Sequence, residues 1–312
     1  MKSDYIWIDG NLVPFEEATV HMLSPAIHYG LAVFEGLRCY ETINGPGVFR
    51  LREHIERLVN SAQIFGVLDL PYDVQDLFDA TLLTIRANRF TECYIRPLIY
   101  MADGPLGLNL DASRPAVSIS TWEWGKFLGD EAFSKGARMI VSSFTRLHPN
   151  VHMTKAKISG NYVNSVMAKT LAVRAGFDEA VMLDPDGYVA ECTGENLFIV
   201  RNGVIHTPPR ATILEGVTRD SVITIARDLN IPVIEEKVTR DQLYIADEMF
   251  VCGTAAEITH VAEIDYRVIG DGQKGPVAKQ VQETFFRTVK GEGTRSEEWL
   301  DMVPVVEYST GI

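Results

Sequence analysis

The chain of 312 residues carries 29 Lys and Arg against 42 Asp and Glu, a formal net charge of −13, and 46% of its residues are hydrophobic. This length exceeds a single ordinary hydrophobic core and suits two domains of roughly 150 residues each, and the balance of apolar and charged residues excludes an intrinsically disordered chain. Because the sequence is strongly acidic, it disfavours nucleic acid and anionic membranes as partners.

The first half begins with two short β-prone runs joined by a Gly10–Asn11 turn, a pattern typical of a hairpin. Local patterning then predicts four elements, which are helices over residues 51–65 and 74–88 and strands over residues 93–101 and 116–122. Residues 125–136 break this periodicity and carry three glycines. We therefore expect a small N-terminal α/β domain over residues 1–127 and an interdomain linker over residues 128–136.

The second half is expected to form a larger domain over residues 137–312. Its predicted elements are, in chain order, a strand over 139–144, a helix over 161–175, a meander of short antiparallel strands around turns at 184–187 and 202–203, a helix that Thr218 caps and that runs to about residue 230, and a helix that begins at Pro276. The helix over 161–175 places Val163, Val166, Met167 and Leu171 on one face. Because helices and strands do not alternate regularly, both halves are predicted to be α+β.

Cysteine usage and the lack of targeting signals predict a cytoplasmic protein. The four cysteines are widely spaced and form no CxxC pair, which indicates neither a disulfide framework nor a zinc ribbon. The N-terminal sequence MKSDYIWIDG lacks the apolar core of a signal peptide. No apolar run reaches the roughly 18 residues that a membrane helix needs.

Two motifs are more simply explained by structure than by function. Residues 270–275 match GxGxxG, but no βαβ unit fits into the 37 residues that follow, so we interpret them as a glycine-rich turn before the last helix. His148 and His152 have the spacing of metal ligands, yet no third ligand is apparent. We therefore expect a solvated or hydrogen-bonded histidine pair and no metal.

Four weaker signals together suggest a site for an anionic group beside a nucleophile. Lys155 and Lys157 directly precede a predicted helix, and spacing alone does not choose between them as the nucleophile. Glu191 and Glu195 lead into an apolar strand, where a carboxylate is costly unless something positive pairs with it. Small residues at 214–220 and 253–257 provide two turns whose backbone N–H groups could hold an anion.

Taken together, these segments resemble the branched-chain amino acid aminotransferases, which are pyridoxal-phosphate enzymes of fold type IV. The resemblance runs in order from about Tyr5 to Leu300, and the segments that carry it are His28–Gly30, Val33–Arg38, Tyr94–Pro97, Lys157–Tyr162, Glu191–Phe198, Leu214–Arg219 and Gly253–Glu257. It implies an α+β fold with a small α/β domain and a larger domain that has a β-barrel-like core. It also implies that the cofactor is pyridoxal 5'-phosphate.

The resemblance assigns roles around this cofactor. Lys157 would form the Schiff base and then act as the general base, and Glu191, not Glu195, would keep the pyridine nitrogen protonated. At about 4 Å and an effective dielectric constant of ~20, that charge pair is worth on the order of 4 kcal/mol. The implied cofactor-binding residues are Arg57, Val217, Thr218 and Thr254 at the phosphate, Tyr162 at the ring hydroxyl, and Lys157, Glu191, Leu214 and Gly216.

The resemblance also implies a substrate pocket of aromatic and small residues. Arg96 would bind the second carboxylate of 2-oxoglutarate, and the N–H groups of the Ala255–Ala256 turn would meet the α-carboxylate. Phe127 stands where some relatives carry a tyrosine, so one hydroxyl that helps to bind the distal carboxylate is missing. The implied substrate-binding residues are Tyr29 from the partner subunit, Phe34, Arg38, Tyr94, Arg96, Trp124, Phe127, Thr254, Ala255 and Ala256.

The function that follows from the resemblance is amino-group transfer between L-leucine, L-isoleucine or L-valine and 2-oxoglutarate, in a ping-pong reaction of branched-chain amino acid biosynthesis. One alternative is another fold-type-IV transaminase that acts on D-amino acids or (R)-amines. A second is a non-catalytic binding protein that kept the fold. The resemblance further implies a homodimer or a higher homo-oligomer, because the active site borrows residues across a subunit interface.

Overall fold

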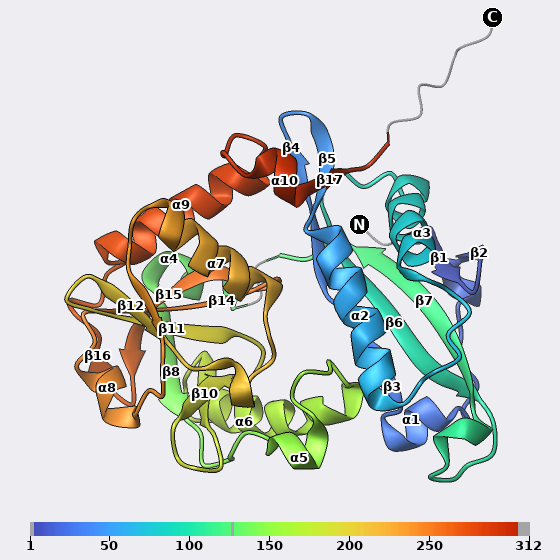
Figure 1. Ribbon diagram of the computed structural model, residues 1–312, viewed down its shortest axis with the longest axis horizontal. Helices are drawn as coiled ribbons and strands as arrows, with labels where there is room; N and C mark the ends of the chain where they lie inside the picture. Colours follow the sequence, from blue (N-terminus) through green and yellow to red (C-terminus); the bar gives the residue numbers. More distant parts are fainter. Residues whose placement is uncertain (1–2, 126–127, 305–312) are drawn as a thin grey trace, which may run out of the picture. The chain divides into compact units, whose positions relative to one another are not determined.

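The computed structural model describes residues 3–125 and 128–304, and the chain divides into two compact units (Figure 1). Within the described residues, unit 1 comprises residues 3–124 and 288–304, and unit 2 comprises the rest. The segment from residue 288 onward therefore belongs with unit 1, whereas the sequence placed it in the second domain. The reason is strand pairing over a long separation, because β17 (Leu300–Met302) adds to the edge strand β5 (Gly45–Phe49).

Unit 1 is built on one antiparallel sheet with strand order β17-β5-β4-β6-β7-β1-β2, and β3 also pairs with β6. The helices α2 and α3 lie next to each other and cover one face of this sheet (Figure 1). Besides β5 and β17, its elements are β1 (Tyr5–Ile8), β2 (Asn11–Pro14), α1 (Pro25–Tyr29), β3 (Ala32–Phe34), β4 (Leu37–Thr42), α2 (Leu51–Phe65), α3 (Val74–Ala87), β6 (Cys93–Asp103), β7 (Arg114–Trp122) and α10 (Ser296–Trp299), with short 3-10 helices at Phe15–Glu17 and Leu110–Ala112.

Local sequence signals explain the elements of unit 1. The predicted hairpin is confirmed, although its turn consists of Asp9 and Gly10, both with positive φ, one residue earlier than expected. The predicted helix over 51–65 is confirmed at both ends, and Gly66 ends it with a φ of +102° and an N–H that donates to the Ala62 carbonyl. The helix α3 begins with a reciprocal capping box between Asp73 and Asp76.

Unit 2 contains the second sheet, with strand order β10-β9-β8-β15-β14-β11-β12-β13 and with β16 paired to β15. Its elements are α4 (Gly129–Lys135), β8 (Ala137–Val141), α5 (Pro149–His152), a 3-10 helix at Ser159–Asn161, α6 (Tyr162–Arg174), β9 (Glu179–Leu183), β10 (Val189–Cys192), β11 (Asn196–Arg201), β12 (Val204–Thr207), a 3-10 helix at Arg210–Thr212, α7 (Val217–Asp228), β13 (Val233–Glu235), α8 (Arg240–Tyr244), β14 (Glu248–Gly253), β15 (Glu257–Ile264), β16 (Arg267–Val268) and α9 (Pro276–Val289), whose last two residues belong to unit 1.

The sheet of unit 2 curls around its own core, as the predicted barrel-like domain requires. The edge strand β10 leads directly into β11, which lies five positions away in the strand order, and the Cys192 N–H donates to the Glu195 carbonyl at 2.8 Å. Side chains from β8, β10 and β14 meet in one buried cluster, which includes Met139, Val189 and Met249. The fold is therefore α+β with a half-barrel second sheet, in agreement with the expected class.

Two features of unit 2 were not predicted from the sequence. The range expected to be a linker, residues 128–136, contains the helix α4. In α6 the predicted extent is confirmed, and within the described part of the chain the residues of its apolar face, Val163, Val166, Met167 and Leu171, are 41–61% exposed. The face that packs on β9 uses Ser165, Ala168 and Ala172 instead, because small residues let the helix lie close to the strand.

The glycine-rich segment at 270–275 is a turn before α9, as predicted. Gly270 and Gly272 have positive φ, and the buried carboxylate of Glu248 accepts hydrogen bonds from the N–H groups of Val277 and Ala278 in the first turn of α9. This is the arrangement that a helix N-terminus favours for an anionic side chain. In the part of the chain that the structure describes, no helix is both long and apolar enough to cross a membrane.

Candidate active site

The two candidate lysines of unit 2 have different partners. The Nζ of Lys157 donates to the Tyr162 hydroxyl at 2.6 Å, across the 3-10 turn that opens α6. The Nζ of Lys155 instead donates to the carbonyls of Arg210 and Ile213 and forms an ion pair with Glu215 at 3.3 Å. Lys155 therefore ties its own segment to the loop at 210–215, and Lys157 is the lysine that is paired with a second reactive side chain.

Glu191 is a buried carboxylate on β10 that accepts hydrogen bonds from three sides. Its Oε1 receives the Nε of Arg146 at 2.8 Å, its Oε2 receives the Nδ2 of Asn196 at 3.1 Å, and the Leu214 N–H lies 3.2 Å from Oε1. The Arg146 side chain is itself almost buried. A buried carboxyl group needs hydrogen-bond partners for its oxygens, and these three donors hold the Glu191 side chain in one orientation.

Arg146 and Asn196 are site residues that the sequence did not identify. The argument that a carboxylate in an apolar strand needs a positive partner anticipated such a group, but 45 residues separate Arg146 from Glu191 and no local signal points to it. Asn196 links Glu191 to the next loop, because its Nδ2 also lies 3.2 Å from the Leu214 carbonyl. A Cβ at Gly216 would lie 2.1 Å from the Asn196 Oδ1, so this approach requires a glycine.

The predicted phosphate turn leads into α7. The sequence predicted Thr218 as the cap, but Gly216 is the N-cap and the helix already begins at Val217. Because the first N–H groups of a helix have no carbonyl partner one turn earlier, and because the helix dipole is positive at this end, the turn favours an anion. Arg219 anchors the helix through Glu235 at 2.9 Å and the Pro208 carbonyl at 2.9 Å.

Thr254, Ala255 and Ala256 form the loop between β14 and β15. The flanking Gly253 and Glu257 are paired across the hairpin, and Glu257 has a φ of +53°. This is a three-residue hairpin loop closed by a residue in the left-handed region. A Cβ at Gly253 would lie 3.3 Å from the Gly194 carbonyl, so this loop begins directly beside the turn that follows Glu191.

The carboxyl groups of Glu179 and Glu195 are also buried in unit 2. Glu179 accepts from the Nζ of Lys169 at 2.7 Å and from the Thr193 hydroxyl at 2.7 Å. Burial, followed by the negative charge of Glu179, raises the pKa of Glu195 well above its usual value, although Lys169 opposes the shift. Glu195 therefore keeps its proton to a higher pH than an exposed glutamate does.

A pH-dependent stability follows from the raised pKa of Glu195. Above about pH 4.3 the unfolded chain releases this proton while the folded chain keeps it, so the free energy of unfolding falls as the pH rises. Below that pH both states are protonated and the contribution vanishes. Glu195→Gln removes the effect, so we expect its stability relative to the unsubstituted protein to rise from about pH 5 to about pH 8.

Urea unfolding at the two pH values measures this difference. Glu56→Gln, which removes an exposed carboxylate from α2, is the control and should show no comparable trend. A stability difference for Glu195→Gln that stays constant over this pH range would contradict a protonated Glu195.

In unit 1 the predicted substrate residues lie together on the sheet. Arg38, Tyr94 and Trp122 are opposite one another on β4, β6 and β7, so their side chains share one face of the sheet. The Tyr94 ring lies 4.4 Å from that of Trp124, and the Arg96 guanidinium lies 4.6 Å from the centre of the Phe34 ring. The structure therefore brings Phe34, Arg38, Tyr94, Arg96 and Trp124 together.

The arginines on this face differ in their partners. Arg38 is buried and its Nη2 donates to the Trp124 carbonyl at 2.8 Å, so it fixes the chain after β7. Arg96 has an Nη2 that donates to the Tyr94 hydroxyl at 3.2 Å, but its buried Nε has no hydrogen-bond partner among the described residues. A buried unpaired N–H of a cation is costly unless an anion completes it, which makes Arg96 suited to a carboxylate.

Tyr29 and Arg57 are the other predicted site residues of unit 1. Tyr29 is the last residue of α1, and its side chain is 41% exposed. Among the described residues, no contact is seen between Tyr29 and another predicted site residue of the same chain. Phe127 lies outside the described residues. Arg57 lies on α2, where its Nε and Nη2 donate to the buried carboxylate of Glu35.

Gly36 is required by the close approach of Tyr94. A Cβ at Gly36 would lie 2.0 Å from the Tyr94 hydroxyl oxygen and 2.9 Å from its ring. We expect Gly36→Ala to displace this ring and to lower the free energy of unfolding by about 1–3 kcal/mol. Gly107→Ala is the matched control, because nothing lies within 4 Å of the added methyl, and it should change the stability by less than about 0.5 kcal/mol. Equal effects of the two changes in urea unfolding would contradict the clash.

The histidine pair shows hydrogen bonds. The His152 Nδ1 lies 2.9 Å from the Asn161 Oδ1, and the His148 Nδ1 accepts from the Asn150 N–H at 3.1 Å. Over the described residues, no group of three or more His, Cys, Asp or Glu is arranged to hold a metal ion.

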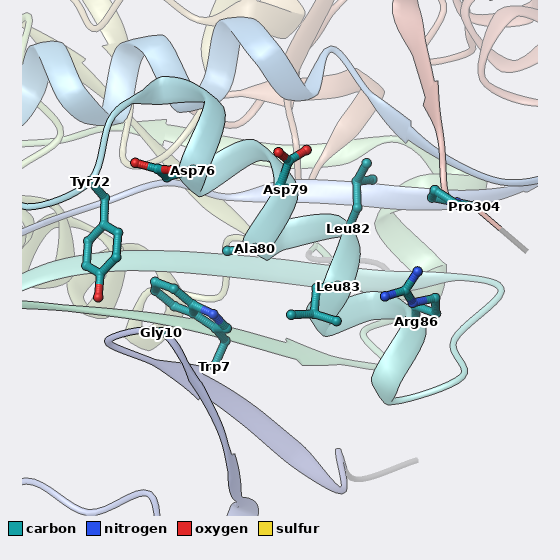
Figure 2. Close-up of a pocket in the computed structure, with 10 residues that line it drawn as sticks. All are labelled: Trp7, Gly10, Tyr72, Asp76, Asp79, Ala80, Leu82, Leu83, Arg86 and Pro304. Atoms are coloured by element: carbon teal, nitrogen blue, oxygen red, sulfur yellow. The ribbon is translucent and has the colours of Figure 1, made fainter. Parts of the chain in front are cut away.

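A pocket of about 520 Å³ in unit 1 contains none of the predicted site residues (Figure 2). It lies between the β1–β2 hairpin, with Trp7, and the helix α3, whose Asp76, Asp79 and Arg86 line it. Burial and the nearby carboxylates of Asp9 and Asp76 raise the pKa of Tyr72 at its edge. Two carboxylates against one arginine disfavour an anionic ligand, so we do not assign this pocket to the site.

Comparison with known proteins gives consistent matches over nearly the whole chain. Residues 32–264 match the family described as amino-transferase class IV. A branched-chain-amino-acid aminotransferase from Escherichia coli (strain K12) is 45% identical over 304 residues, which cover 97% of this chain and 98% of that protein. One from Pseudomonas aeruginosa is 43% identical over 302 residues, with 97% and 98% covered.

Solved structures agree with these matches. A crystal structure of the branched-chain amino acid aminotransferase of Escherichia coli is similar with a TM-score of 0.95 at 44% identity, and the match covers 97% of this chain and 100% of that chain. The branched-chain amino acid aminotransferase of Thermobaculum terrenum, solved in its PLP-form (holo-form), is similar with a TM-score of 0.90 at 36% identity, and the match covers 97% of this chain and 99% of that chain.

Proposed function

The chain belongs to the amino-transferase class IV family, and from this premise we infer that it is a branched-chain-amino-acid aminotransferase that uses pyridoxal 5'-phosphate. It moves an amino group between L-leucine, L-isoleucine or L-valine and 2-oxoglutarate. The observation that carries this inference is the Lys157 amine, held 2.6 Å from the Tyr162 hydroxyl at the start of α6.

The residues of unit 2 fit the chemistry of this cofactor. When bound, pyridoxal 5'-phosphate supplies an aldehyde that takes up the amino group and a ring that withdraws electrons from the α-carbon. Its ring nitrogen needs a carboxylate, which Glu191 offers, and its phosphate needs an anion site, which the N-terminus of α7 offers at Val217 and Thr218. These residues of unit 2 therefore fit pyridoxal 5'-phosphate.

Lys157 moves the proton in this reaction. Its Nζ can take a proton from the α-carbon of the amino donor and return one to the acceptor, which is general acid–base catalysis. Tyr162 orients the Nζ through their hydrogen bond. Arg146 and Asn196 hold the Glu191 carboxylate in place, so that its charge does not have to reorganise during the reaction.

The other proposed roles concern the phosphate of the cofactor, the carboxylates of the substrates and the apolar side chain of the amino donor. Arg57, Thr218 and Thr254 bind the phosphate together with the N–H groups of Val217 and Thr218. The N–H groups of the Ala255–Ala256 turn bind the α-carboxylate, and Arg96 binds the second carboxylate of 2-oxoglutarate. The other cofactor-side residues are Leu214 and Gly216, and the apolar side chain of the substrate meets Phe34, Tyr94 and Trp124.

Turnover of three amino donors tests this function. L-Leucine, D-alanine and (R)-1-phenylethylamine are compared with 2-oxoglutarate as acceptor, and L-leucine is expected to give the highest kcat/KM. Parallel lines in double-reciprocal plots are expected, because one site processes the donor and the acceptor in turn. Preference for D-alanine or the (R)-amine would assign the chain to another transaminase, and no turnover with any donor would favour a binding protein.

We propose that the enzyme is a homodimer or a higher homo-oligomer in which the partner subunit's Tyr29 completes the substrate pocket. Two apolar surfaces support this proposal, the exposed face of α6 with Val163 and Val166 and the segment around α1 with Met22 and Ile27. Light scattering tests the assembly, and a fully active monomer would contradict it. A cytoplasmic location is also proposed, on the support of four buried cysteines that form no disulfide.

A further inference from the structure

Glu35 lies between β3 and β4, and its carboxylate has several partners. Its side chain is fully buried, its Oε1 receives the Arg57 Nε at 2.5 Å, and its Oε2 receives the Arg57 Nη2 at 2.8 Å. The Nδ1 of His54, which is also buried, lies 2.7 Å from Oε2. The Gly36 N–H adds a contact at 3.2 Å. Both oxygens are therefore engaged, and α2 supplies both side chains that bind them.

The pairing fixes the plane of the Arg57 guanidinium. A two-point bond between an arginine and a carboxylate restricts rotation about the last torsions of the side chain, which a single contact would leave open. The Arg57 side chain is nevertheless 14% exposed, whereas its neighbours Ile55 and Leu58 are fully buried. Arg57 therefore binds the buried Glu35 carboxylate on one side, while part of its side chain is exposed at the surface of unit 1.

Packing alone does not account for this arrangement. A buried ion pair is often no more stabilising than apolar residues of similar volume, because both charges lose their hydration. Burial by itself raises the pKa of Glu35, yet the charges of Arg57 and His54 and the hydrogen bonds from them hold that pKa well below its usual range. Glu35 is therefore charged at neutral pH, and the guanidinium has an anionic partner there.

We propose that Glu35, supported by His54, is a positioning residue that presets the Arg57 guanidinium to receive the cofactor phosphate. This inference rests on the proposed function, and it adds a residue that none of the cofactor contacts inferred above includes. Its physical basis is preorganisation, because a guanidinium already fixed in place loses less conformational freedom when an anion binds. Glu35 acts only through Arg57 and does not itself contact the cofactor.

The test compares the affinities of the cofactor-free protein for pyridoxal 5'-phosphate and for pyridoxal, which lacks the phosphate. The ratio of the two affinities reports the phosphate site alone. Glu35→Gln is expected to lower the affinity for pyridoxal 5'-phosphate ~10–100-fold, the range of a hydrogen bond to a charged group. Its affinity for pyridoxal is expected to stay within about twofold. Glu56→Gln, which removes an exposed carboxylate beside Arg57, is the control and should leave the ratio unchanged.

The Arg57→Gln background distinguishes positioning from a general loss of structure. If Glu35 acts through Arg57, Glu35→Gln changes the ratio no further in that background. An equal fall of both affinities, or an additive fall in the double variant, would overturn the proposal. If Glu35→Gln does not fold, Glu35→Asp replaces it in the same comparison, and an unchanged ratio there overturns the proposal as well. Failure of the unsubstituted protein to bind either compound would instead refute the proposed function.

Discussion

Replacing Lys157 by alanine is expected to lower kcat for transfer from L-leucine to 2-oxoglutarate by about 10⁴-fold or more, the upper range for loss of a general acid–base. The Lys157 Nζ donates a hydrogen bond to the Tyr162 hydroxyl at 2.6 Å, and alanine has no amine with which to form the Schiff base or to move the proton. Steady-state rates with L-leucine measure the loss. Borohydride reduction followed by peptide mass analysis gives a second readout, since the cofactor mass should be attached to Lys157.

Lys155→Ala is the matched control for this prediction. Lys155 lies two residues earlier, but it binds the carbonyls of Arg210 and Ile213 and the carboxylate of Glu215. Its loss should loosen that loop and change kcat by less than about tenfold, because it removes surface-type contacts and no proton transfer. If Lys157→Ala retains turnover and Lys155→Ala abolishes it, the assignment of the nucleophile is reversed.

Replacing Glu191 by glutamine is the second large effect, with an expected fall in kcat of about 10²–10³-fold. A carboxylate beside a protonated ring nitrogen is worth on the order of 4 kcal/mol at an effective dielectric constant of ~20, and each 1.4 kcal/mol is about a factor of ten in rate. The glutamine side chain also places an NH2 group where the carboxylate accepted hydrogen bonds. Arg146, Asn196 and the Leu214 N–H all donate to this side chain, so the NH2 group would face other donors. The expected result is a slower reaction and a looser loop at 214–217.

The pH dependence of the visible absorption of the cofactor-loaded protein separates this effect from general damage. The unsubstituted protein should hold one spectral form over a wider pH range than Glu191→Gln, because the carboxylate stabilises the protonated ring. Glu195→Gln is the control, as its carboxyl is already protonated and lies in the Glu179 cluster. An unchanged spectrum and rate in Glu191→Gln, together with a loss in Glu195→Gln, would transfer the role to Glu195.

Local patterning was sufficient for most elements. The helix over 51–65, the strands of β6 and β7 and the hairpins at 202–203 and at the N-terminus follow from apolar spacing and turn residues within a few positions of one another. Such signals depend on neighbours in the chain, and these are known from the sequence alone. The motif segments around Lys157, Glu191 and Gly216 also lie on the turns and strand ends where small and charged residues had suggested them.

The features that the sequence did not predict depend on contacts between residues far apart in the chain. The spacing of apolar residues predicts the apolar face of α6 correctly, but whether a face meets this chain or another surface is not a local property. The pairing of β17 with β5 joins residues about 250 positions apart. The partner of Glu191 proved to be Arg146, and the partner of Arg57 proved to be Glu35, neither of which stands at a helical or strand spacing from it.

The sequence by itself therefore determined the class of chemistry, because an amine, a carboxylate and anion-binding turns of the right types occur in the order of one family. It also determined the elements, since their signals are short-range. Only the tertiary structure shows that Lys157 is hydrogen-bonded to Tyr162, that Arg146 binds Glu191 and that Glu35 binds Arg57. The physical reason is that a buried charge is satisfied by whatever opposite charge the fold brings within about 3 Å, and that distance does not depend on separation along the chain.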